Sequence, residues 1–153
     1  MATVDFPSSL PLPERTGYGL QHTSTFARTT MASGRAKQRA MFTSVPTAAP
    51  VEWILTNSQA QVFEAWFTHG IGNGVAWFNC KLQTPMGLKD YKCQFKAMYE
   101  GPELIGVDHW RIRAELEIFE RPIFSKEWYL YGLQFIEYSS IIDQAMNREW
   151  PKP

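Results

Sequence analysis

Two stretches of alternating side chains constrain the fold of this chain more than any other feature. In residues 91–99 and 110–118, apolar residues occupy nearly every second position, and mostly polar or charged residues fill the positions between them. A period of two over nine residues is typical of a β-strand with one buried and one solvated face. We expect these two strands to pair antiparallel, with opposite charges meeting across the ladder. The residues expected to meet are Lys92, Lys96, Glu115 and Glu117.

Shorter strands are predicted at 23–30, 37–45 and 51–55, with another beginning near Val75. Between them, Thr56 and Gln59 have the spacing of a capping box, which predicts a helix start. Four bulky apolar residues then share one helical face, and Gly70 is placed to end the helix. The helix should therefore pack on the sheet. The side chains expected in the core are Trp53, Phe63, Trp66, Phe67, Trp77, Phe95, Trp110, Ile112 and Leu116.

The ends of the chain differ in character from its centre. Residues 1–22 contain Pro7, Pro11 and Pro13 and predict an extended arm that other chains hold in place. The β-rich core domain is expected over 23–121. Residues 122–153 predict a C-terminal extension, helical over about 126–148 and then extended. The predicted fold class is mainly β (α+β): an antiparallel barrel or sandwich with one short packed helix, an extended N-terminal arm and a helical C-terminal extension.

Charge is balanced overall but unevenly distributed. The chain has 15 basic and 15 acidic residues, so it lacks the basic excess typical of proteins that bind free nucleic acid or anionic membranes. The segment from Ser33 carries Arg35, Lys37 and Arg39, which suit either a solvated hairpin loop or a contact with acidic surfaces of a neighbour. DNA is expected there at most transiently. The residues expected at subunit interfaces are Arg35, Lys37, Arg39, Trp128, Tyr131 and Trp150.

No pattern of catalytic or metal-ligating residues stands out. His22, His69 and His109 lie in separate contexts without the spacing of metal ligands. Cys80 and Cys93 are expected to be reduced, buried thiols. The glycine-rich run at 70–74 follows a helix and precedes a strand, the wrong order for a phosphate-binding loop. We therefore expect a protein that is not an enzyme and uses no cofactor or metal.

The order of elements resembles a known family. A Gly17-Tyr18 turn precedes a helix with the pattern Phe63-x-x-Trp66-Phe67, and a glycine turn leads to Trp77-Phe78 and two long alternating strands. This arrangement, over roughly 15–121, is similar to phage minor tail proteins of the lambda M type and to the N-terminal barrel of distal tail proteins. The resemblance implies a ring-forming tail-tip subunit whose hairpin, with Arg35, Lys37 and Arg39, helps to build the tube wall.

The resulting hypothesis is a structural subunit of a virion, located in a phage tail and made in the host cytoplasm. Its partners are expected to be further copies in a ring and neighbouring tail or connector proteins, without a membrane, since no signal peptide or apolar span is apparent. The ends of the chain depart from the lambda-type protein, which keeps open a head–tail connector or a tube-capping protein. A second class remains: a carbohydrate-binding β-module that stacks sugars on exposed tryptophans such as Trp77, Trp110 or Trp128.

Overall fold

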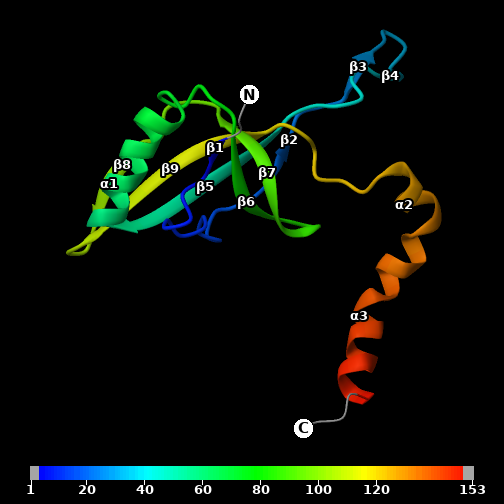
Figure 1. The fold of residues 1–153 in the computed structure, drawn as a ribbon. Coiled ribbons are helices and arrows are strands. Elements are labelled where there is room, and N and C mark those ends of the chain that lie inside the picture. Colours follow the sequence, from blue (N-terminus) through cyan, green and yellow to red (C-terminus); the bar gives the residue numbers. More distant parts are fainter. Residues whose placement is uncertain (1–3, 150–153) are drawn as a thin grey trace. The chain divides into compact units, whose positions relative to one another are not determined.

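The computed structural model describes residues 4–149, which form two units divided after Pro122. The first unit contains nine strands and one helix that ends in a π-helical turn, and the second contains two helices (Figure 1). The elements are β1 (Val4–Asp5), β2 (Gln21–His22), β3 (Phe26–Thr30), β4 (Ala36–Ala40), β5 (Thr47–Thr56), α1 (Asn57–Ala65), η1 (Trp66–Gly70), β6 (Phe78–Thr84), β7 (Gly87–Phe95), β8 (Glu100–Ile105), β9 (His109–Ile118), α2 (Lys126–Tyr131) and α3 (Leu133–Glu149).

Seven of these strands form one sheet built around β9. Its strand order is β1-β6-β7-β9-β5-β2, and β8 also pairs with β9. Along one side of β9 lies β5, antiparallel over ten residue pairs, and on the other side β7 and β8 follow each other. The prediction of a mainly β, α+β fold is confirmed, although the described strands form an open path and do not close into a barrel.

The longest pairing differs from the one that the alternation predicted. Residues 93–95 of β7 pair with β9, but the full-length partner of β9 is β5. The reason is a break after Phe95: β7 ends there, and the chain resumes as β8 beyond Tyr99. Just after the end of β7, Lys96 Nζ still lies 2.7 Å from Glu115 Oε1 of β9. Lys92 pairs with neither Glu115 nor Glu117, and its Nζ lies over aromatic rings instead. Alternation identified the strands correctly, but not their partners.

Proline in β5 explains why sequence reasoning began this strand too late. The strand starts at Thr47 and continues through Pro50, with Thr47, Ala49, Val51, Trp53 and Leu55 buried. Pro50 pairs with Glu115 of β9, while β2 reaches only the first two residues of β5. On the side away from β9, Pro50 therefore has no strand partner, and the N–H that proline lacks costs no ladder hydrogen bond there.

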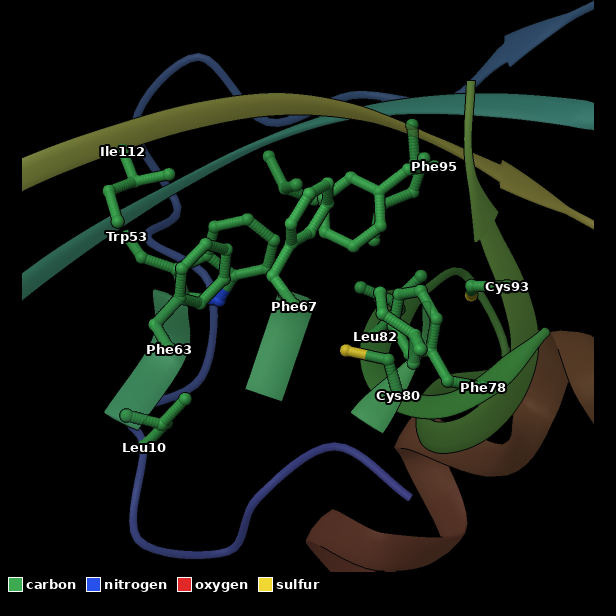
Figure 2. Packing of buried hydrophobic residues seen from close by; sticks show 14 of the residues in the cluster. Leu10, Trp53, Phe63, Phe67, Phe78, Cys80, Leu82, Cys93, Phe95 and Ile112 are labelled. Carbon is green, nitrogen blue, oxygen red and sulfur yellow. The ribbon is translucent and has the colours of Figure 1, made fainter. Parts of the chain in front are cut away.

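Helix α1 seals the core on one face of the sheet. Both hydrogen bonds of the predicted capping box, between Thr56 and Gln59, are present. The helix continues into η1 and ends at Gly70, as its sequence suggested. Phe63 and Phe67 are buried beneath it, together with Trp53 and Phe95 of the sheet (Figure 2).

The N-terminal segment packs against the core of its own chain, contrary to the expectation that other chains hold it. Strand β1 pairs with β6, and the amide of Phe6 donates to the carbonyl of Asn79 at 2.9 Å. The Phe6 ring stacks on Trp53 with a centroid distance of 5.8 Å. Leu10 is buried in the core cluster (Figure 2). The few apolar residues of this segment are sufficient to hold it, because the sheet offers an apolar surface to receive them.

In the hairpin and the second unit the predicted kinds of element are present, strands and helices respectively, but their bounds differ from those predicted. The strands expected at 23–30 and 37–45 form β3 and β4, which within residues 4–149 pair with each other and with no further strand. The helix expected over 126–148 is divided by Gly132 into α2 and α3. A side chain at Gly132 would collide with the ring of Trp128, which explains the small residue.

The packing of the N-terminal segment can be tested by substitution. Leu10→Ala should lower the free energy of unfolding by about 2–5 kcal/mol, because it removes a buried side chain and leaves a cavity. Leu12→Ala is the matched control, since Leu12 is 43% exposed and should cost much less. Urea or guanidinium unfolding of the isolated protein measures both. Equal, small effects would mean that the segment is not part of the folded core.

Candidate assembly surfaces

The residues predicted to form the core lie in three environments. Trp66 and Trp110 are half-buried and pack against the core cluster, and the Trp110 indole N–H also donates to Asn57 Oδ1 at 2.5 Å. Trp77 lies outside that cluster. The other six are buried, namely Trp53, Phe63, Phe67, Phe95, Ile112 and Leu116.

Trp77 is a correction to the predicted core. Strand β6 begins at Phe78, which is fully buried, so the residue before it cannot share that face. The Trp77 ring instead meets Phe119 edge to face, with centroids 5.3 Å apart. Lys92 lies over both rings, with Nζ 5.7 Å from the Trp77 centroid and 5.2 Å from that of Phe119. Successive residues of a strand face opposite sides, so the prediction, which was wrong by one residue, placed Trp77 in the core instead of Phe78.

The β3–β4 hairpin is exposed along almost its whole length. Nine of its ten strand residues are exposed, and Ala27 is half-buried. Lys37 and Arg39 alternate with Gln38 along β4 and therefore share one face. Arg35 lies in the connecting turn, where its carbonyl accepts a hydrogen bond from the amide of Met31. The structure thus brings the three predicted basic interface residues together in one hairpin.

This hairpin lacks the usual sources of stability. A two-stranded hairpin without a packed face is at best marginally stable in water. Phe26, Met41 and Phe42 are each more than half exposed beside it. Among the described residues, no ion pair joins its basic side chains to a carboxylate. A binding partner would supply both the apolar cover and the counter-charge.

The charges on the outer face of the main sheet, in contrast, satisfy one another. Glu52 lies 2.8 Å from Arg111 Nε and accepts a hydrogen bond from Arg113 Nε at 3.1 Å. This hydrogen bond is the main cause of a raised pKa at Arg113. Glu103 lies 3.8–3.9 Å from the same two arginines. These side chains are therefore occupied within the chain.

The second unit exposes its apolar side chains on nearly every side. Trp128 is 48% and Tyr131 87% exposed, and the interface role of both residues stays a prediction. Trp150 lies outside the described residues. On α3, spacings of three to five residues place exposed apolar side chains on one broad helix face. The residues of that face are Phe135, Tyr138, Ile141 and Met146.

Polar chemistry among the described residues is sparse. His22 Nδ1 lies 3.0 Å from the hydroxyl of Thr47, and His69 lies in the last turn of η1. Cys80 and Cys93 are free and buried, and burial raises the pKa of both thiols, that of Cys80 to about 12. No group of three or more His, Cys, Asp or Glu side chains is arranged to hold a metal ion within residues 4–149. No helix in that range is long and apolar enough to cross a membrane.

Comparisons with known proteins give a likeness of fold. No family model matches the sequence, and no curated protein does. Among solved structures, a chain of the virion of the native gene transfer agent particle has the same fold, with a TM-score of 0.54 at 12% sequence identity. The match covers 79% of this chain and 98% of that chain. The first unit, residues 1–122, makes up a similar share of the 153 residues.

Separating the two units should leave the first intact. Every buried residue of the core cluster lies between Leu10 and Ile118. A chain ending at Pro122 is therefore expected to keep the midpoint of its thermal unfolding within a few degrees of the full chain. It should also be more soluble, because the exposed aromatic residues of the second unit are gone. Circular dichroism melting of both chains measures this, and loss of a cooperative transition in the shorter chain would contradict it.

Proposed function

We propose that this chain is a structural subunit of a virion, without enzymatic activity, and that it forms a ring at the distal end of a phage-like tail. The observation that carries the proposal is the shared fold with the gene transfer agent virion chain, nearly all of which is matched. A fold alone does not define function. The surfaces of this chain provide the second support.

Those surfaces suit a protein that works by contact. The hairpin β3–β4 and the helices α2 and α3 expose aromatic and aliphatic side chains that a solitary soluble protein would normally cover. Aromatic residues are also the usual anchors of protein interfaces. We assign the hairpin to contacts between copies in the ring, and the second unit to contacts with neighbouring tail proteins. On this proposal DNA passes the ring without being held.

A head–tail connector or tube-capping protein is the nearest alternative, because such proteins use the same kinds of contact. Carbohydrate binding has less support. Trp77 packs edge to face on Phe119 with Lys92 over both rings, and Trp110 packs on the core, so both rings are already in contact with side chains of this chain. Trp128 is exposed, but it is surrounded by other exposed apolar residues, which favours a protein partner.

Locating the protein in purified particles tests the proposal. Particles carrying this chain with a C-terminal affinity tag would be labelled with gold and imaged by electron microscopy. Label at the distal tip of the tail is the expected result, and deletion of the gene should yield particles without that tip. Label at the neck would instead favour the connector. Particles that lack the chain altogether would contradict any structural role in the virion.

A further inference from the structure

The basic residues of the chain are separated from most of its acidic residues along the sequence. Between Arg15 and Val51 there are five basic residues and not one Asp or Glu. The other ten basic residues accompany all fifteen acidic ones. Four of the five basic residues, all except Arg15, lie in the β3–β4 hairpin. The hairpin is therefore a strongly positive projection on a chain with no net charge.

A group of exposed carboxylates lies on and around β8. Glu100 belongs to β8, and Asp108 lies in the turn before β9. Glu64 of α1 joins them, because it lines the same shallow hollow as Pro102. All three side chains belong to exposed residues. We call this group the acidic edge.

The register of β5 and β9 places the hairpin and the acidic edge at opposite ends of one sheet. His22 pairs with Thr47, so both connections to the hairpin leave from the Thr47 end of β5. The acidic edge lies at the other end, where Thr56 pairs with His109 and β8 pairs with the first half of β9. Ten residue pairs separate the ends, which is about 30 Å at 3.3 Å per residue.

Both surfaces also expose apolar side chains among their charges. Leu104 and Val107 are 54% and 86% exposed within the acidic edge, and Met31 and Met41 are 47% and 51% exposed at the hairpin. An apolar centre rimmed by charge is the usual composition of a protein interface. The outer side of β8 has no strand partner among the described residues, but Pro102 limits continuous strand addition there. Side-chain contacts would thus dominate.

From this complementarity we propose that the β3–β4 hairpin of one copy docks on the acidic edge of the next copy, head to tail. A contact between opposite ends of identical subunits is heterologous, and it produces a closed ring when the rotation between copies closes. This inference rests on the proposed function, since it names the two surfaces through which the ring subunits would join. The partner that the hairpin binds is therefore a second copy of this chain.

Paired charge reversals test the proposal. One variant carries R35E, K37E and R39E in the hairpin, and the other carries E64K, E100K and D108K in the acidic edge. Glu103 is left in place because it lies close to Arg111 and Arg113. K89E and D90K, on exposed residues of β7, each reverse one charge and control for a change of charge elsewhere on the surface. Circular dichroism melting establishes that every variant is folded, and sedimentation velocity measures self-association.

Each reversed variant alone should associate at least about tenfold more weakly than the unaltered protein, because like charges then face each other. Mixing the two variants should restore association, since each hairpin again meets an edge of opposite sign. Raising the salt from 50 mM to 500 mM should weaken the unaltered assembly by screening these charges. The two control variants should associate as the unaltered protein does.

Several outcomes would overturn the inference. If the unaltered protein associates but folded edge variants do so equally well, the inference fails while the ring proposal stands. The same holds if the mixture of the two variants remains dissociated. If the hairpin variant loses binding to a DNA duplex and the edge variant associates normally, the hairpin is a nucleic-acid contact instead. An unaltered protein that stays monomeric at high concentration and is absent from the tail tip contradicts the proposed ring itself.

Discussion

The rest of the first unit depends on the packing of aromatic rings between the continuous helix α1–η1 and the sheet. Trp66 meets Phe78 edge to face at 5.0 Å, Phe67 meets Phe95 at 5.1 Å, and both Trp53 and Trp66 contact Phe6. Such pairs contribute about 0.5–1.5 kcal/mol each beyond their burial. The cluster joins the N-terminal segment, β5, the helix, β6 and β7, so five separate parts of the chain are fixed by one set of contacts. Because the sheet does not close on itself, its apolar face has to be covered by this aromatic cluster.

A core placed so fully on one face leaves the remaining surfaces free for assembly. On the outer face of the sheet, Glu52 pairs with Arg111 and Arg113. These charges therefore need no counter-charge from another molecule. The hairpin and the second unit lack such compensation: one has unpaired positive charge and the other exposed apolar side chains. In physical terms the chain consists of a self-sufficient domain and two elements that leave charged or apolar groups exposed. That division is what we expect of a subunit built into a larger particle.

Sequence reasoning succeeded where local patterns determine local structure. The capping box of Thr56 and Gln59, the end of the helix at Gly70 and the alternation in β9 all have direct counterparts in the structure. It failed where the outcome depends on distant residues. Phe78 was passed over for Trp77 because both are aromatic and only the register of β6 with β7 decides which one faces inward. Leu10 was missed because nothing in a proline-rich segment indicates that a sheet elsewhere offers it a site.

By itself the sequence determined that the chain would be mainly β with a packed amphipathic helix, and that its basic residues would gather in one early segment. These properties follow from side-chain periodicity and from the order of residues, which no folding can change. The tertiary structure decided that β5, not β7, would be the main partner of β9, and that the N-terminal segment would belong to the core. It also decided that positive and negative surfaces would lie at opposite ends of the sheet. Such pairings join residues far apart in the chain, and their free energy depends on burial that only the complete fold provides.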